Sequence, residues 1–328
     1  MRETALEARA PGTPFIVTSL PPMPAPIHLI PLASPVTDAD LAPFPGSLVV
    51  CDCYVAGAER WTPVTGGFEH GRVLNVDHHA DDPRMHRQVS SANLALAHVA
   101  ERGGPPDDVT VVVNHADCDS ILSSGIMSGR LEPDPGYGVA AIAADHTGAE
   151  HPVADLLQAL DRERDLELSF TSLDDLLNGR PLPDVARRAL DDRRRMRAEA
   201  ERVVREGRIA MDGPIAWGVF DETIFGEFFP ALLPEATVIL AIAPHRDLLP
   251  DRLEMKLRLG TGAPPGFSLK GLLDDFDPGF GGRWNAGANK RPRDGRPGGS
   301  DVPPAIYAAE VRRRVEERLA GRPIAEYA

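Results

Sequence analysis

The sequence is poor in cysteine and in aromatic residues, and it lacks long apolar runs. Three cysteines among 328 residues exclude a disulfide framework and favour a reducing compartment. Aromatic residues make up 5% of the chain, so aliphatic side chains must fill its cores. No stretch approaches the roughly 20 apolar residues of a membrane span, and charged residues interrupt the N-terminus where a secretory signal would be apolar. We therefore expect a cytoplasmic protein without a membrane partner.

Acidic residues outnumber basic ones, with 49 Asp and Glu against 35 Lys and Arg. The formal net charge is −14 at pH 7, whereas a protein that wraps a long nucleic acid needs a basic surface to neutralise phosphates. The sequence therefore disfavours long nucleic acids as partners. A small phosphorylated substrate remains compatible with this charge, because a few local arginines and bound cations can hold it.

The length of the chain predicts more than one domain. A Pro-rich segment comes first, and a charged helix with nine arginines between Arg187 and Arg208 divides the rest. We interpret that helix as a solvated connector with intrahelical ion pairs. The predicted organisation is an N-terminal arm (1–45), a catalytic domain (46–183), the connecting helix (184–209) and a substrate-binding domain (210–328).

The apolar pattern predicts an α/β fold with two lobes. In the first lobe, buried strands alternate with helices, which is typical of a doubly wound, mainly parallel sheet. Its expected strands are 47–53, 73–76 and 109–113, and its expected helices are 90–102, 120–128 and 153–166; segment 138–144 fits either type. The smaller second lobe has expected strands at 215–220, 236–242 and 253–259, and an amphipathic helix at 305–319.

Two groups of His and Asp follow predicted strands. Asp77-His78-His79 ends the strand at 73–76, and His115-Ala-Asp117-Cys-Asp119-Ser follows the strand at 109–113. Ligands collect at the carboxyl ends of strands in α/β sheets. Imidazole and carboxylate ligands together suit Mn²⁺, Fe²⁺, Mg²⁺ or Zn²⁺. Eight of the ten histidines lie between His70 and His151, so the chemistry is expected in this part of the chain.

A glycine-rich segment near the C-terminus has the composition of a phosphate-binding loop. It reads Gly-Phe-Gly-Gly-Arg-Trp-Asn-Ala-Gly-Ala-Asn-Lys-Arg over residues 279–291. Glycines let a backbone approach a phosphate closely, and arginine binds phosphate oxygens in a bidentate manner. We expect this segment to bind substrate through four residues: Arg283, Asn285, Lys290 and Arg291.

Together these motifs resemble the DHH phosphoesterase superfamily, which includes RecJ-like nucleases, nanoRNases and exopolyphosphatases. The resemblance covers roughly residues 46–320, and the glycine-rich segment looks like the signature of the DHH-associated C-terminal domain. It implies two divalent cations, most often Mn²⁺, with Mg²⁺, Co²⁺ or Fe²⁺ as alternatives, in a cleft between the lobes. Such a pair of cations can stabilise both the attacking and the leaving oxygen of an in-line displacement.

The resemblance also implies a role for each residue. His115 and Asp117 would bind the first cation, and His78, Asp119 and Asp145 would bind the second. Asp52 would bridge the two. His79 would face the phosphate, and Asp77 would orient His78 from behind.

The order of the motifs departs from that superfamily, in which the His-x-Asp-x-Asp strand normally comes first. Here the order is Asp52, then Asp77-His78-His79, then His115 to Asp119, then Asp145, which resembles a circular permutation. Asp52 and Asp145 are the residues that this departure affects most. The alternatives are a strand-terminal turn for Asp52 and a helix cap with a turn for Asp145.

The expected function is metal-dependent hydrolysis of a phosphodiester or phosphoanhydride in a small substrate, with short oligonucleotides and other small nucleotides as the first choice. Three alternatives stay open: an exopolyphosphatase, a RecJ-like exonuclease on single strands, and a non-catalytic scaffold. The exonuclease would call for a basic groove with stacking aromatics, which the composition disfavours. A homodimer is compatible with the sequence.

Overall fold

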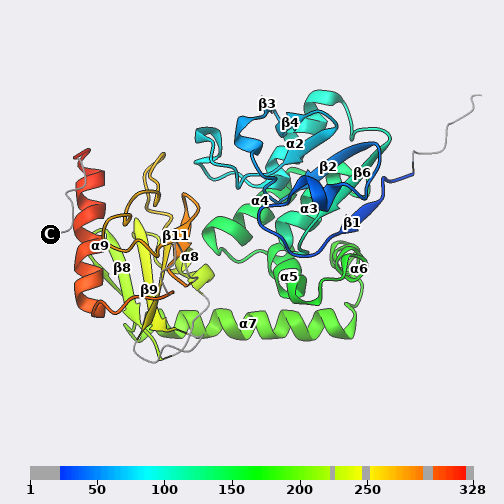
Figure 1. Cartoon of the computed structure of the whole chain (residues 1–328). Helices are drawn as coiled ribbons and strands as arrows, with labels where there is room; N and C mark the ends of the chain where they lie inside the picture. Colours follow the sequence, from blue (N-terminus) through cyan, green and yellow to red (C-terminus); the bar gives the residue numbers. More distant parts are fainter. Residues whose placement is uncertain (1–22, 222–225, 246–251, 291–297, 323–328) are drawn as a thin grey trace, which may run out of the picture.

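The computed structural model describes residues 23–221, 226–245, 252–290 and 298–322. Two α/β lobes lie side by side above a long helix, α7 (Asp184–Arg205), which runs beneath both of them (Figure 1). The predicted two-lobed α/β fold is confirmed. No helix in the described ranges has both the length and the apolar character needed to cross a bilayer.

The N-terminal lobe is built on a six-stranded sheet in the order β1-β6-β2-β5-β4-β3. The first four of these strands are mutually parallel, and β4 and β3 add an antiparallel edge. The sequence analysis did not predict this edge: the hairpin of β3 and β4 lies in the connection from β2 to β5, where no helix or strand was expected. The strands are β1 (Ile27–Leu29), β2 (Ser47–Cys51), β3 (Thr62–Val64), β4 (Gly67–His70), β5 (Val73–Val76) and β6 (Val109–Val113).

The central strands are apolar because they are buried. Strands β2 and β6 read Ser-Leu-Val-Val-Cys and Val-Thr-Val-Val-Val, and their C-terminal halves are fully buried, as expected of strands inside a parallel sheet. Val50 pairs with Val112 on one side and with Asn75 on the other. This register brings the carboxyl ends of β2, β5 and β6 to one edge of the sheet.

Strand β1 belongs to this sheet, although the sequence assigned residues 1–45 to an arm. Its backbone pairs with β6, with Ile27 opposite Val111 and Leu29 opposite Val113. The first lobe therefore begins before residue 46. Residues 1–22 lie outside the described part of the chain.

Helices pack beside the sheet, and their ends follow local sequence signals. Helix α2 begins after Ser90, whose hydroxyl accepts from the Asn93 amide, and it ends at Gly103, which has a φ of 80°, a left-handed conformation that glycine adopts easily. The helix expected at 153–166 ends earlier, at Leu160. A short 3₁₀ turn (Asp161–Glu163) follows, and the chain changes direction at Arg164, which has a φ of 50°, before α6 begins at Leu166. Segment 138–144 is mainly helical. The helices are α1 (Asp38–Leu41), α2 (Ser91–Arg102), α3 (Cys118–Met127), α4 (Pro135–Ile142), the π-helical turn η3 (Ala143–Thr147), α5 (Pro152–Leu160) and α6 (Leu166–Leu177).

The C-terminal lobe has a second six-stranded sheet, in the order β11-β12-β10-β9-β8-β7. Only β8 and β9 run parallel; the other neighbours in this sheet are antiparallel. Helix α9 (Pro304–Leu319) packs Tyr307 and Val311 on one face of the sheet, and the end of α7 covers part of the other face. The strands are β7 (Ala210–Asp212), β8 (Ile215–Val219), β9 (Val238–Pro244), β10 (Leu253–Leu259), β11 (Gly281–Gly282) and β12 (Ala286–Ala288).

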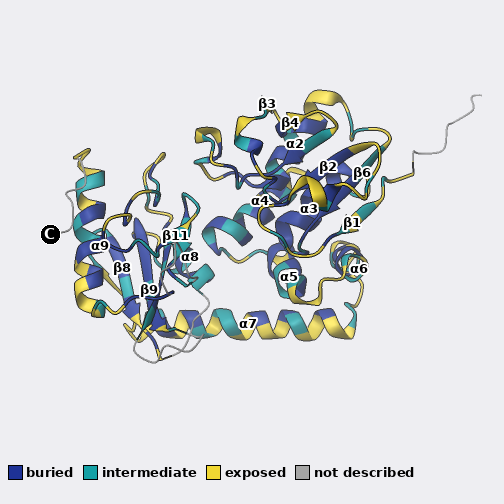
Figure 2. Cartoon of the chain, in the orientation of Figure 1, coloured by how far each residue is buried: buried dark blue, intermediate teal, exposed yellow. Residues whose placement is uncertain are grey.

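Helix α7 is more than the solvated connector that the sequence predicted. Its exposed side carries the expected intrahelical ion pairs, for example Arg194 with Asp191. Its inner side is buried (Figure 2), and Arg193 on that side binds Asp155 of α5 at 3.0 Å and Glu227 of the C-terminal lobe at 2.6 Å. Arg193 therefore ties the helix to both lobes.

We predict that Arg193→Met destabilises the protein by about 3–5 kcal/mol, because removing one partner of a buried ion pair leaves uncompensated charge. Urea denaturation followed by circular dichroism measures this change. The matched control is Arg194→Met on the same helix, whose exposed pair should contribute little. Equal destabilisation by both variants would contradict the role assigned to Arg193.

Candidate metal centre

The His and Asp groups of the two motifs meet at the carboxyl edge of the first sheet. Asp52 follows β2, the Asp77-His78-His79 group follows β5, and His115 comes two residues after β6. Asp117 and Asp119 lie at the start of α3, and Asp145 lies in η3. The structure thus brings together all six residues expected to bind metal.

Asp52 lies at the centre of this group. Its backbone has a φ of 52°, an uncommon conformation for a residue other than glycine, and its side chain is almost fully buried. Two hydroxyls hold the carboxylate: Ser91 donates to Oδ1 at 3.0 Å and Ser120 donates to Oδ2 at 2.8 Å. Asp52 is therefore part of the candidate site, and its side chain does more than end the strand with a turn.

On one side of Asp52, His78 faces three carboxylates. Its Nε2 lies 3.2 Å from Asp145, 3.8 Å from Asp52 and 3.9 Å from Asp119. The other ring nitrogen, Nδ1, lies 2.6 Å from the carbonyl oxygen of Val89. A carbonyl partner fixes the tautomer with hydrogen on Nδ1 and leaves Nε2 as the free ligand atom, as in most metal-bound histidines.

On the other side of Asp52, His115 has a similar arrangement. Its Nε2 lies 3.1 Å from Asp52 Oδ2 and 3.5 Å from Asp117, and its Nδ1 lies 2.5 Å from Asn114 Oδ1. Asp117 also caps α3 by accepting from the Ser120 amide. A single Asp52 carboxylate therefore faces two separate ligand groups through its two oxygens.

These groups have the spacing and the chemistry of cation sites. Within each group, the ligand atoms lie within 4.8 Å of one another. Imidazole and carboxylate without thiolate is a donor set for borderline or hard divalent cations; Cys118 packs in the apolar core instead. The groups are Asp52 with His78, Asp119 and Asp145; Asp52 with His115 and Asp117; and Asp52 with His78 and His79.

The dense negative charge of this site shifts the pKa values of its buried groups. Burial raises the pKa of Asp119 well above its usual range, and the Asp52 carboxylate raises it further. Burial alone would lower the pKa of His115, but Asp117 and Asp52 outweigh it and raise that pKa to about 12. Burial likewise opposes a charge on His78, yet Asp145 and Asp119 raise its pKa. Divalent cations bound between these groups would offset the same negative charge.

The sequence analysis expected Asp77 to orient His78, but in the structure Asp77 contacts His79. Its carboxylate accepts from the backbone amide of His79 at 2.9 Å, and it lies 2.6 Å from Nδ1 of the same residue. Val89 takes the expected place behind His78. Asp77 therefore fixes the ring of His79, whose side chain keeps about 25% of its surface exposed.

The second lobe contributes two arginines. Arg283, from the glycine-rich segment, places its Nη1 3.1 Å from Nε2 of His78. Arg258 on β10 donates to the backbone oxygen of Asp145 at 3.2 Å. Sequence reasoning missed Arg258, although the alternation of Glu254, Lys256 and Arg258 between apolar residues of β10 marks one polar face of the strand.

The other expected substrate-binding residues have different surroundings. Asn285 is buried, and its Nδ2 lies 3.1 Å from Nδ1 of His146, next to the metal group. Lys290 makes no side-chain contact with the metal group in the described part of the chain; its backbone oxygen accepts from His245. Arg291 lies outside the described residues.

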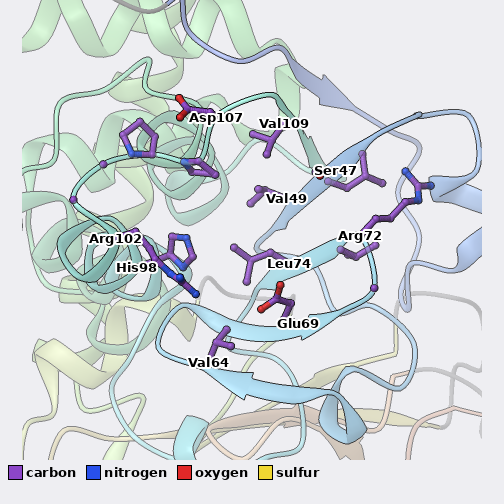
Figure 3. Close-up of a pocket in the computed structure, with 17 residues that line it drawn as sticks. Ser47, Val49, Val64, Glu69, Arg72, Leu74, His98, Arg102, Asp107 and Val109 are labelled. Carbon is purple, nitrogen blue, oxygen red and sulfur yellow. The ribbon is translucent and has the colours of Figure 1, made fainter.

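A separate cavity of about 710 Å³ opens on the first lobe, away from the metal group. Figure 3 shows Ser47, Val109 and Arg72 around it, near the starts of β2, β6 and β5. These are the amino ends of the strands, whereas the metal ligands follow the carboxyl ends. This cavity is therefore not part of the candidate metal centre.

Comparison with known proteins leaves the family of the chain open. No family model matches it, and no curated protein matches it. Among solved structures, it is similar to a pGpG-specific phosphodiesterase, PggH from Vibrio cholerae, with a TM-score of 0.41 and 12% identity over 87% of this chain and 86% of that chain. An uncharacterized protein from Helicobacter pylori G27 has a TM-score of 0.22 and 8% identity over 83% of this chain and 98% of that one. Neither likeness assigns an activity.

We predict that Mn²⁺ stabilises the metal-free protein, because a ligand that binds only the folded state raises its stability, by about 2.7 kcal/mol at roughly 100 times its Kd. The measurement is the increase in Tm on addition of Mn²⁺ after treatment with a chelator. Asp52→Asn should lose most of this increase, since Asp52 belongs to all the ligand groups. The control Asp191→Asn, on the exposed side of α7, should keep the full increase in Tm. An increase in Asp52→Asn as large as in the wild type would refute the metal centre.

Proposed function

We propose that this protein is a divalent-metal-dependent phosphodiesterase or phosphohydrolase that acts on small phosphorylated substrates, with short oligonucleotides and other small nucleotides as the first choice. The observation that carries the proposal is the arrangement around Asp52: two ligand groups share its carboxylate, and an arginine from the other lobe faces them. Membership of the DHH superfamily, with permuted motifs, is part of this proposal.

The ligands would divide between two cations, with Mn²⁺ as the first choice. Asp52 would join the two, with His115 and Asp117 on one side and with His78, Asp119 and Asp145 on the other. When bound, the cations supply Lewis-acid stabilisation of phosphoryl oxygens and lower the pKa of water enough to generate a nucleophile near neutral pH. No serine or cysteine nucleophile is then required.

The residues around the ligands keep this arrangement rigid. Ser91 and Ser120 fix both oxygens of Asp52. The backbone amides of Ser91 and Ala92, at the start of α2, each donate to Asp119 at 2.7 Å. A carboxylate has about four lone-pair positions, so these bonds orient Asp119 and leave it able to bind a cation.

Arg283 and Arg258 provide the positive charge that a phosphate needs. Arg283 already lies against the metal ligands, and its planar guanidinium can bind two phosphate oxygens at once. Arg258 lies beside Asp145, where burial lowers its pKa and Arg283 lowers it further. We assign both to charge stabilisation of the phosphoryl group.

His79 completes the site from the first lobe. Asp77 holds a proton on its Nδ1, so the Nε2 atom on the far side of the ring is free to exchange a proton or a hydrogen bond with a substrate oxygen. The side chain of His79 is about 25% exposed, whereas that of His78 is buried. We propose His79 as the residue that contacts the phosphate.

The completeness of the ligand set favours an enzyme over a non-catalytic scaffold. A scaffold has no use for buried carboxylates packed this densely, which are costly without a compensating charge. The net charge of −14 favours a small substrate over a long single strand.

The proposal predicts that the protein releases mononucleotide from a 5′-phosphorylated dinucleotide when Mn²⁺ is added to the chelator-treated protein. Asp119→Asn should abolish turnover, because it removes a ligand charge while keeping the size of the side chain. Asp191→Asn on α7 serves as the control that keeps activity. Absence of turnover by the wild type, with Mn²⁺ shown to be bound, would overturn the nucleotide phosphodiesterase.

Arg283 offers a second test of the same site. Arg283→Met should lower kcat on the dinucleotide by about 100-fold, the effect of losing one charge-stabilising donor. Arg283→Lys should restore part of the loss, since it keeps the charge and lacks the bidentate fork. Steady-state kinetics measure both, and an unchanged kcat in Arg283→Met would exclude contact between this residue and the reacting phosphate.

A further inference from the structure

A cavity of about 380 Å³ lies between the lobes, next to the metal centre. This size falls in the range of small-molecule pockets, which are mostly apolar with a few oriented polar groups. The wall that the C-terminal lobe contributes is largely apolar and includes Leu259, Ala263 and Phe267. Residues 86–88 of the first lobe form the opposite wall. Trp284, Asn285 and His146 lie where the cavity approaches the metal ligands.

Aromatic rings from both lobes border this cavity. The ring of Trp284 is stacked with that of His86 across the cleft, with centroids 6.2 Å apart and an interplanar angle of 29°. The ring of His146 lies 5.9 Å from Trp284. Both Trp284 and His86 are half-buried, so each keeps ring surface that a planar ligand can contact.

The cavity also holds a polar group that lacks a partner. Asn285 is 5% exposed, and its Oδ1 has no hydrogen-bond partner among the described residues. A buried acceptor left unpaired costs about 1–3 kcal/mol, so this oxygen is suited to an N–H donor of a ligand. The exposed amide of Gln88 lies at the same cavity and can offer both donors and an acceptor.

A fixed chain of contacts connects the cavity with the metal ligands. Asn285 Nδ2 lies 3.1 Å from His146 Nδ1, and His146 Nε2 lies 3.1 Å from the Val89 oxygen that also holds His78. This pattern fits a hydrogen on His146 Nε2, which the Val89 oxygen accepts, and leaves Nδ1 to accept from Asn285. The rings of His146 and His78 are 5.6 Å apart. His146 is thus the side chain that separates the cavity from the ligand His78.

We propose that this cavity is the binding site for a nucleobase of the substrate, stacked on Trp284 and contacted at its edge by Asn285. This inference rests on the proposed function, because it assigns the base of the nucleotide whose phosphate the metal centre would hold. Every nucleobase has a flat face for stacking and polar atoms at its edge. Polyphosphate has no flat face and no N–H donor for the Asn285 oxygen, and among the described lining residues Arg87 is the single arginine or lysine.

The test is a titration with 2-aminopurine ribonucleoside 5′-monophosphate, whose emission falls when the base stacks on an aromatic ring. The wild type should quench this emission, and GMP or AMP should reverse the quenching at lower concentration than ribose 5-phosphate. Trp284→Leu should weaken binding on the order of ten-fold, the typical effect of losing one base–aromatic stack. The matched control Trp61→Leu removes a tryptophan that contacts His70 away from the cavity, and it should bind as the wild type does.

Equal binding by Trp284→Leu and the wild type would overturn the base site, and so would equal competition by ribose 5-phosphate and GMP. Binding requires no turnover, so the two proposals fail in different ways. Quenching without dinucleotide hydrolysis would refute the phosphodiesterase and keep the base site. Dinucleotide hydrolysis without quenching would refute the base site and keep the phosphodiesterase.

Discussion

The buried carboxylate of Asp52 is the constraint on which the rest of the site depends. It lies at the end of a central strand, in a left-handed backbone conformation, with a hydroxyl on each oxygen and a ligand group on each side. Such a concentration of buried negative charge is unfavourable without compensation. The imidazole of His115, 3.1 Å from Asp52, and the arginine beside His78 can provide part of this compensation.

The contact between the two lobes also brings positive charge to these carboxylates. The first lobe supplies the acidic group, and the second supplies Arg283 and Arg258. Contacts away from the site hold the lobes together: Arg193 of α7 binds both, and Lys270 pairs with Asp81, just after the His78 motif. The nearby cavity with Trp284 and His86 exists only in this arrangement, since its walls come from both lobes.

Much of the fold followed from periodicity, and the exceptions have local causes. The strands at 73–76 and 109–113 were predicted with the bounds that the structure has, because apolar β-branched runs leave little alternative. The break at Arg164 and the hairpin of β3 and β4 were missed, since short strands and a single left-handed residue leave little trace in hydrophobic periodicity.

The sequence by itself determined the residue types of the site and the strand ends that carry them, because a run of His and Asp after an apolar strand has few other uses. It also indicated that Arg283 and Asn285 belong with them. Only the tertiary structure decided that Asp52 faces both ligand groups, that Asp77 holds His79 and Val89 holds His78, and that Arg258 reaches Asp145. Some of these contacts join segments that lie far apart in the chain, and others depend on the direction in which one side chain points. A pattern of residue types along the sequence specifies neither the distance between two segments nor the direction of a side chain.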